Sequence, residues 1–390
     1  MTAETESGVA SGVSARSRAL HFRSLVIDTH VDTTQRLLCD AFDLGVQQAD
    51  GSVDIPRLRE GGVGAIFFAI WMPGTVTGPQ AVQRALQQIE AVHAHVARHA
   101  RDLVLARTAQ DIREARAARA AGRIAVLIGL EGGHMLNHDL GVLREYARLG
   151  VRYMTLTHMR NTDWADASTD APVHNGLSDF GKEVIREMNR LGMAVDISHA
   201  SDKAVADALA TSAAPVFASH SSCYALCASP RNLRDDLIRG IAAKGGVVQV
   251  NFHMGFLSQR FRDAENADPN LERDVDARAE ERSAGDPGRL MIEAENAVRE
   301  MVAEGKLPRV DWTEIVDHID HAVKVAGADR VGLGSDFDGA DMPFGMEDAS
   351  HLPQITEALL DRRYSEDDIR KILGGNALRF LQDVEAFANP

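Results

Sequence analysis

The chain has 390 residues, of which 57 are acidic and 42 basic, and a formal net charge of −15 at pH 7. Lysine and arginine do not gather into a basic face, so nucleic acid is excluded as an expected partner. Three cysteines cannot build a disulfide framework in a chain of this size. With no run of 18 apolar residues, no signal-peptide core in Met1–Arg18 and no anchor tail evident, we expect a cytoplasmic protein with no membrane partner.

The polar residues 1–20 are expected to form a disordered tail, and residues 21–390 a single catalytic domain. Eight short runs rich in Val and Ile follow this tail. Each run is apolar throughout rather than alternating, which is typical of a strand buried on both faces. In chain order the eight predicted strands are Leu25–Asp28, Ala65–Trp71, Ile124–Leu130, Tyr153–Thr157, Met193–Ile197, Pro215–Ala218, Val247–Asn251 and Arg330–Gly334.

Segments with helical spacing of apolar residues lie between these runs. The clearest are Gln80–His99, Ser178–Leu191, Asp311–Val325 and Ser365–Leu373. Strands that alternate with helices predict parallel pairing, in a doubly wound open sheet or in a closed barrel. Eight is the strand number of the barrel, and no Gly-x-Gly-x-x-Gly turn follows the first strand. We therefore predict an α/β fold, a (β/α)8 TIM-type barrel, with the charged stretch Ser258–Lys306 as a helical insertion before strand eight.

The active site of a (β/α)8 enzyme lies at the C-terminal ends of its strands. Six of the eight predicted strands run into His, Asp or Glu, namely His30 and Asp32, Glu131, His158, His199, His220 and Asp336. Four histidines and three carboxylates exceed the roughly four ligands of one tetrahedral zinc ion. Two metal ions bridged by a carboxylate and a hydroxide would use them. His30 and Asp32, two residues apart on an extended chain, point to the same side as a chelating pair requires.

Arg231 lies in the loop after the sixth predicted strand, where its planar guanidinium is placed to bind a carboxylate. A surface ion pair with Asp235 or Asp236 is the alternative. His134 is interpreted as a residue that orients a metal ligand. Structural roles are favoured for the other histidines and cysteines considered, which are His93, His95, His99, His318, His321, Cys223 and Cys227.

The stretches that contain these residues resemble the membrane (renal) dipeptidase family of the amidohydrolase superfamily. The resemblance runs from about Ile27 to Leu381. It is carried by Glu131–His134, Leu156–Asn161 with Trp164–Asp166, Glu187–Met193 leading to Asp196–His199, Ser219–Ser222, Pro230–Asn232, Asp317–His321 and Gly334–Gly339. These strings are specific to the family, whose members cleave dipeptides, commonly tolerate a D-residue at the C-terminal position and in some cases open β-lactam rings.

The resemblance implies two Zn²⁺ ions per chain, although nitrogen and oxygen ligands also accept cobalt or manganese. It implies that His30 and Asp32 bind the more buried ion and that His199 and His220 bind the second. Glu131 would bridge the two ions. His158 would contact the substrate and the developing oxyanion, Arg231 would hold the dipeptide's C-terminal carboxylate, and Asp336 would be the acid/base residue.

The sequence thus predicts a dinuclear zinc dipeptidase that hydrolyses L-Xaa-L-Xaa or L-Xaa-D-Xaa dipeptides by attack of a hydroxide that bridges the metals. Small dipeptides are its expected partners, and a homodimer fits the family. Another amidase or lactonase acting on a small carboxylate-bearing substrate is the alternative. A catalytically inactive barrel that binds metal or peptide as a sensor would have lost a ligand or Asp336, and all seven strand-end positions are filled.

Two departures from the family are expected to matter. Its mammalian members are secreted and lipid-anchored, which the ends of this chain do not support. The stretch Asn251–Phe256 and the insertion after it resemble a bacterial variant of the family. We expect its preference among dipeptide side chains to differ from that of the mammalian members.

Overall fold

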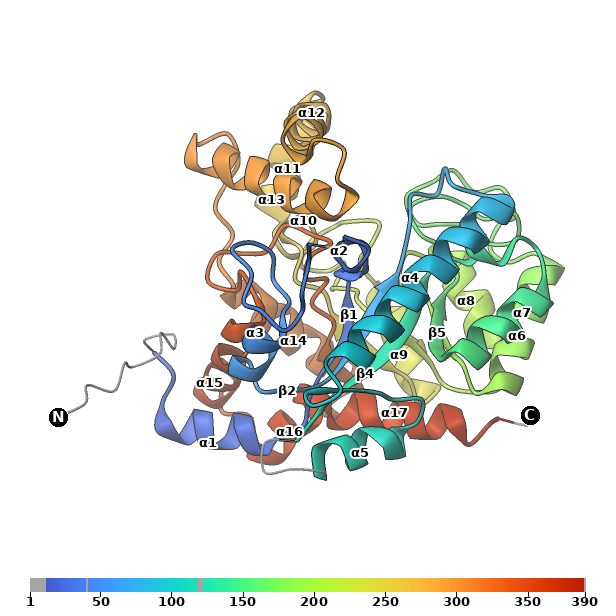
Figure 1. The fold of residues 1–390 in the computed structure, drawn as a ribbon, viewed down its shortest axis with the longest axis horizontal. Coiled ribbons are helices and arrows are strands. Elements are labelled where there is room, and N and C mark those ends of the chain that lie inside the picture. The colour runs from blue at the N-terminus through green and yellow to red at the C-terminus, as the bar shows by residue number, and fades with distance from the viewer. Residues whose placement is uncertain (1–11, 40, 118–121, 389–390) are drawn as a thin grey trace.

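The structure, a computed structural model, describes residues 12–39, 41–117 and 122–388. Eight parallel strands form a closed ring at its centre, surrounded by helices (Figure 1). In ring order the strands are β1 (Val26–Val31), β2 (Val63–Ile70), β4 (Ile124–Glu131), β5 (Val151–Thr155), β6 (Ala194–Asp196), β7 (Val216–Ala218), β8 (Val247–Val250) and β9 (Val331–Leu333). Pairing of β9 with β1, through Leu333 and Asp28, closes the ring. The predicted TIM-type barrel and its eight strands are confirmed.

A further strand, β3 (Leu103–Leu105), lies outside this ring and was missed by the sequence analysis. It pairs with the first residues of β4, so that Val104 lies opposite Ala125. The later residues of β4 pair with β5, and Ala125 also faces Ala65 of β2. β3 therefore extends the start of β4 without entering the barrel.

Helices connect the strands around the ring. They are α2 (Thr34–Leu37), α3 (Ile55–Glu60), α4 (Gly78–Arg98), α5 (Ala109–Ala117), α6 (Leu140–Leu149), α7 (Asp179–Leu191), α8 (Asp202–Thr211), α9 (Asp235–Ala243), α14 (Thr313–Ala326), α15 (Pro353–Asp361), α16 (Glu366–Arg370) and α17 (Asn376–Glu385). The four helices predicted from spacing correspond to α4, α7, α14 and α16. The last of these continues through a π-turn, Lys371–Gly375, into α17.

One end of the barrel is covered by α17. Phe380 of this helix stacks on Phe217 of β7 with ring centroids 4.6 Å apart. It joins a buried cluster with Ile27, Ala65 and Val247, which all lie in the first half of their strands. The helix therefore covers the beginnings of the strands and leaves their C-terminal ends free for the site.

The predicted insertion before the last barrel strand is confirmed as helical. It consists of α11 (Gln259–Ala267), α12 (Leu271–Ser283) and α13 (Pro287–Ala303), preceded by the short α10 (Met254–Leu257). These helices project together from the barrel, at the top of Figure 1. Helix α13 packs against α2, which directly follows β1. The insertion is thereby placed over the part of the barrel mouth that holds the end of β1.

The prediction that residues 1–20 form a disordered tail is wrong for residues 12–20, which the structure describes. Helix α1 (Ala15–Arg23) begins within it, because the Ser14 side chain caps the helix by accepting a hydrogen bond from the Ser17 backbone. Leu20 is fully buried in the main core. Residues 1–11 lie outside the described part of the chain. Among the described residues, none of the helices is long and apolar enough to cross a membrane.

Candidate active site

The end of β1 supplies two of the predicted metal ligands. His30 is fully buried, Asp32 is 7 % exposed, and the Nε2 atom of His30 lies 3.4 Å from Oδ1 of Asp32. The two side chains therefore converge, as their spacing on an extended strand predicted. The backbone N–H of Asp32 donates to the carbonyl of Phe337, which ties this end of β1 to the loop after β9.

Glu131, the last residue of β4, occupies the centre of the strand ends. Its Oε1 atom lies 3.0 Å from Nε2 of His199, 3.3 Å from that of His220, 3.5 Å from that of His30 and 3.8 Å from that of His158. Burial opposes the negative charge of this carboxylate, but the surrounding histidines outweigh it and hold the pKa of Glu131 well below its usual range. One carboxylate oxygen is thus shared by the imidazoles of four strands.

His199 and His220 follow β6 and β7, and both are buried. Burial, with the charge of Arg231 beside it, holds the pKa of His199 well below its ordinary value. Burial and the neighbouring His30 lower the pKa of His220 in the same way. Neutral imidazoles offer the nitrogen lone pairs that metal ligation requires.

A hydrogen-bonded chain behind His220 fixes its orientation. The Ser219 hydroxyl donates to Oδ2 of Asp196 at 2.6 Å and, with its proton so used, accepts from Nδ1 of His220 at 2.7 Å. Protonation at Nδ1 leaves Nε2 with its lone pair toward Glu131. Such partners behind a histidine ligand set its tautomer and raise its basicity.

His30 has a comparable partner in Tyr153 of β5. The phenol oxygen lies 2.8 Å from Nδ1 of His30, and both side chains are fully buried. The tyrosine ring crosses the barrel over Gly129 of β4. A Cβ atom on Gly129 would lie 2.0 Å from the ring carbon Cζ of Tyr153, so only glycine leaves room for this contact.

Asp336 and His158 flank the cluster. Oδ1 of Asp336 lies 3.8 Å from Nε2 of His30, and its Oδ2 accepts a hydrogen bond of 2.8 Å from the Asn251 side chain. Asp336 and His199 adopt left-handed backbone conformations, with φ of 68° and 64°. Such strain at non-glycine residues occurs chiefly where function requires it. The His158 ring lies 4.7 Å from that of His199, and its side chain is 16 % exposed.

Arg231 is 3 % exposed, and its guanidinium stays positively charged at neutral pH although burial lowers its pKa to about 10. One of its nitrogens donates to the carbonyl of His220, while Nε and Nη1 have no hydrogen-bond partner among the residues that the structure describes. The guanidinium carbon lies 5.1 Å from the centre of the Phe256 ring. The alternative of a surface ion pair with Asp235 or Asp236 is wrong, because Arg231 is buried and forms no ion pair with either carboxylate among the described residues; Asp235 pairs with His321 and Arg239 instead.

The residues present fit a metal centre. Ligand atoms lie within 4.8 Å of one another in three groups, which are His30 with Glu131 and His220, Glu131 with His158 and His199, and His30 with Asp32 and Asp336. Nε2 of His30, Oδ1 of Asp32 and Oε2 of Glu131 are buried and have no hydrogen-bond partner in the described part of the chain. Each such atom costs roughly 1–3 kcal/mol. Cations bound to these nitrogen and oxygen donors would satisfy all three.

The other singled-out histidines and cysteines lie apart from this cluster. His318 bridges the Cys223 backbone N–H and the carbonyl of Leu257, which is a structural role. Cys223 and Cys227 are buried thiols, as expected. His134 makes no hydrogen bond to any predicted ligand within the described residues. It nevertheless lies close enough to His158 and Glu131 for their charges to affect its pKa.

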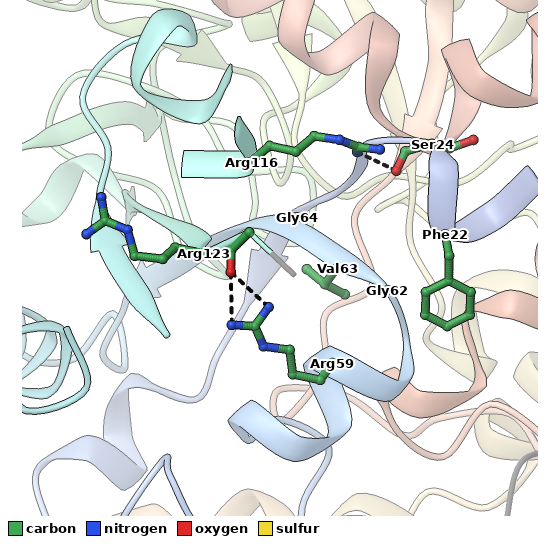
Figure 2. Close-up of a pocket in the computed structure, with 9 residues that line it drawn as sticks. Phe22, Ser24, Arg59, Gly62, Val63, Gly64, Arg116 and Arg123 are labelled. Carbon is green, nitrogen blue, oxygen red and sulfur yellow. Dashed lines mark hydrogen bonds between the residues drawn. The ribbon is translucent and has the colours of Figure 1, made fainter. Parts of the chain in front are cut away.

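A cavity of about 430 Å³ lies at the opposite end of the barrel, where Val63 begins β2. Figure 2 shows the residues that line it. Three arginines line it, and two of them, Arg59 and Arg116, bind backbone oxygens there. Arg59 donates to the carbonyl of Gly122 at 3.2 Å, and Arg116 donates to that of Ser24. These cations are satisfied by backbone oxygens, far from the strand ends that carry the imidazoles. The cavity is therefore separate from the candidate active site.

Comparison with protein families matches residues 14–390 to the model described as "Membrane dipeptidase (Peptidase family M19)". Dipeptidase tcpJ of Claviceps purpurea is 35 % identical over 350 residues, which cover 87 % of this chain and 70 % of that protein. Human Dipeptidase 3 is 32 % identical over 382 residues, which cover 95 % of this chain and 67 % of that protein.

Solved structures agree with these sequence matches. The probable dipeptidase PvdM from Pseudomonas aeruginosa superposes with a TM-score of 0.80 at 27 % identity, covering 96 % of this chain and 98 % of that one. A metallo peptidase from Rhodobacter sphaeroides, liganded with a phosphinate mimic of the dipeptide L-Ala-D-Ala, superposes with a TM-score of 0.75 at 26 % identity. That match covers 93 % of this chain and 99 % of the other.

Proposed function

The chain belongs to the membrane dipeptidase family, peptidase family M19, and is a metal-dependent dipeptidase; from this premise we propose that it uses two zinc ions to hydrolyse L-Xaa-L-Xaa and L-Xaa-D-Xaa dipeptides. The observation that carries the proposal is the single Glu131 oxygen within 3.0–3.8 Å of four histidine nitrogens. His30 and Asp32 would hold one ion, His199 and His220 the other, and Glu131 both.

Zinc ions held there would supply a water molecule whose pKa is lowered toward about 7, together with a positive charge that polarises the scissile carbonyl. The remaining chemistry is assigned to side chains. Asp336 would take the proton of the attacking water and deliver it to the amide nitrogen that becomes the leaving amine. Asn251 donates to the other carboxylate oxygen and so keeps Oδ1 of Asp336 directed at the cluster.

His158 and Arg231 supply orientation and charge. His158 would donate to the carbonyl oxygen as negative charge develops on it. The free Nε–H and Nη1–H groups of Arg231 would bind the C-terminal carboxylate. A longer peptide would present a neutral amide to this buried cation and leave it unpaired, which is costly. Selection for dipeptides follows from that penalty.

The first experiment is release of free amino acids from a library of L-Xaa-L-Xaa and L-Xaa-D-Xaa dipeptides, with zinc-loaded and chelated protein side by side. Metal-dependent cleavage with two zinc ions per chain is the expected result. A protein that holds two metals and cleaves no dipeptide would instead point to another amide or lactone with a free carboxylate. The cytoplasmic location and the homodimer stay predictions; size-exclusion chromatography with light scattering tests the latter.

A further inference from the structure

The two ends of a bound dipeptide would face different strands of the barrel. Arg231, proposed to hold the C-terminal carboxylate, follows β7. Trp71 follows β2, which lies four strands from β7 in either direction around the ring. The two residues therefore lie on opposite sides of the barrel mouth. A dipeptide anchored at Arg231 would then direct its amino-terminal residue toward Trp71.

Trp71 lies beside His158 of the metal-ligand cluster and also lines a cavity. Its ring lies 6.3 Å from the ring of His158, and its Nε1–H donates to the backbone carbonyl of Asp32. On its other side it lines a cavity of about 460 Å³ between α4 and the insertion helix α13. This volume accommodates a long side chain.

The walls of this cavity combine apolar surface with a single positive charge. Trp71, Met72, Val76 and Leu290 contribute apolar atoms, and glutamine side chains contribute neutral polar groups. Arg84 of α4 is the only charged residue among the described residues that line it. The absence of a lining carboxylate contrasts with the net charge of −15 for the whole chain.

Arg84 is held in place rather than left to solvent. Its Nη2 donates to Oε1 of Gln35 at 3.1 Å, and Nε2 of Gln35 donates to the carbonyl of Trp71 at 2.7 Å. Gln35 is 7 % exposed, so this link between the Trp71 wall and the guanidinium is itself buried. No ion pair to Arg84 is formed within the described ranges of the chain, and its charge is available to a ligand.

We propose that this cavity is the subsite for the amino-terminal side chain of the dipeptide and that Arg84 makes it select a long acidic side chain. The assignment rests on the proposed dipeptidase function. The side-chain methylenes of a glutamyl residue would lie against Trp71 and Met72, and its carboxylate would pair with Arg84. A charge-assisted contact of this kind corresponds to about a tenfold preference for the acidic side chain.

The test compares kcat/KM for L-Glu-L-Ala, L-Gln-L-Ala and L-Leu-L-Ala on the zinc-loaded full chain. We expect L-Glu-L-Ala to exceed L-Gln-L-Ala by about tenfold and the ratio to fall as salt screens the charge. Arg84→Gln should bring the ratio to about one, and Arg84→Glu should favour L-Lys-L-Ala instead. Arg98→Gln, the same change at an exposed position of the same helix, is the matched control and should keep the wild-type ratio.

The possible results distinguish failure of the proposed acidic subsite from failure of the proposed dipeptidase function. A wild-type ratio of one, or a ratio that Arg84→Gln leaves unchanged, would overturn the acidic subsite while cleavage of L-Leu-L-Ala still supports the dipeptidase. Failure to cleave any of the dipeptides would reject the proposed function instead. Metal content and the thermal midpoint, measured for each variant, show whether a lost preference reflects a misfolded protein.

Discussion

The Nε2 atoms of His199 and His220 lie 3.0 Å apart, although the two residues stand at the ends of neighbouring strands. Both imidazoles have lowered pKa values, and His220 carries its proton on the far nitrogen, bonded to Ser219. A proton on Nε2 of His199 or a cation beside the pair would satisfy the lone pair of His220. We expect this pair, together with Glu131, to bind positive charge.

Replacing the central carboxylate tests that conclusion. Glu131→Gln should lower metal affinity and kcat/KM by at least about a hundredfold, because a loss in the ligand shell exceeds the 10–100-fold typical of outer partners. Metal content after dialysis, measured by mass spectrometry, is the readout. Glu90→Gln, an exposed position on α4, is the control. Two metal ions per chain retained by Glu131→Gln would contradict the bridging role.

The Ser219 hydroxyl should matter to metal binding although it touches no metal. Ser219→Ala breaks the chain from Asp196 to His220 and frees the imidazole to change tautomer. We expect about a 10–100-fold loss of zinc affinity in a chelator competition titration. Ser221→Ala removes a hydroxyl that bonds Ser198 rather than a histidine, and should retain wild-type affinity. Equal zinc affinities for the two variants would show that the hydrogen-bonded chain behind His220 does not support metal binding.

Substitutions of Tyr153 and Gly129 test whether the contact between Tyr153 and His30 supports zinc binding, separately from its effect on packing. Tyr153→Phe removes the partner of His30 but preserves packing, so zinc affinity should fall while the thermal midpoint changes little. Gly129→Ala places a methyl group against the tyrosine ring and should also destabilise the fold by about 1–3 kcal/mol. Urea unfolding and zinc titration of both variants distinguish loss of orientation from loss of packing. Unchanged zinc affinity in Tyr153→Phe would remove the positioning role.

Arg231 should affect substrate binding more than turnover. Arg231→Ala is expected to raise KM for dipeptides by about 10–100-fold, since a buried charge-assisted contact is lost. The effect should vanish for dipeptide amides, which lack the C-terminal carboxylate. Steady-state kinetics on matched acids and amides measure it. An unchanged KM for the acids would show that another group binds the carboxylate.

The insertion should be less stable at high pH. Burial raises the pKa values of Glu265 on α11 and of Asp341 after β9 to about 7, and repulsion between them adds to the rise at Asp341. Arg262 and Arg299 oppose this, while Glu272 reinforces it at Glu265. A raised carboxyl pKa means that the folded state binds more protons than the unfolded chain between about pH 4 and 7. The free energy of unfolding therefore falls as pH rises through that window.

Glu265→Gln, which imitates the protonated side chain, isolates this contribution. The variant should match the wild type near pH 5 and exceed its urea midpoint at pH 8. Glu280→Gln on α12, at an exposed position, is the control. A variant less stable than the wild type at pH 8 would show that the Glu265 charge is favourable.

The barrel could be predicted because its strands are buried on both faces and are apolar throughout. β3 was missed since two of its three residues are partly exposed and the strand is too short to form a recognisable run. Helix α1 was missed for the opposite reason. Its sequence is polar, and it is stabilised by the Ser14 cap and by burial of Leu20, a contact with the main core that no local pattern reveals.

The candidate ligands could be predicted because His, Asp and Glu at successive strand ends are conspicuous. Their supporting residues could not, because neutral side chains such as Tyr153 and Ser219 resemble ordinary core residues. Tyr153 sits in an apolar run, and only the fold shows that its hydroxyl reaches His30 across Gly129. Trp71 and Arg84 are far from the histidine motifs in sequence, and only the fold shows that Trp71 lies across the barrel mouth from Arg231 and that Arg84 lines the same cavity as Trp71.

The left-handed backbone at His199 and Asp336 bears on how the protein can be stabilised. Each non-glycine residue held there costs roughly 1–2 kcal/mol, so glycine would relax the backbone at both positions. A library selected only for heat resistance would accumulate that change and lose an imidazole and a carboxylate. Selection for heat resistance and selection for turnover therefore favour different residues at positions 199 and 336. A thermostable variant that stays active must carry its stabilising substitutions at other positions.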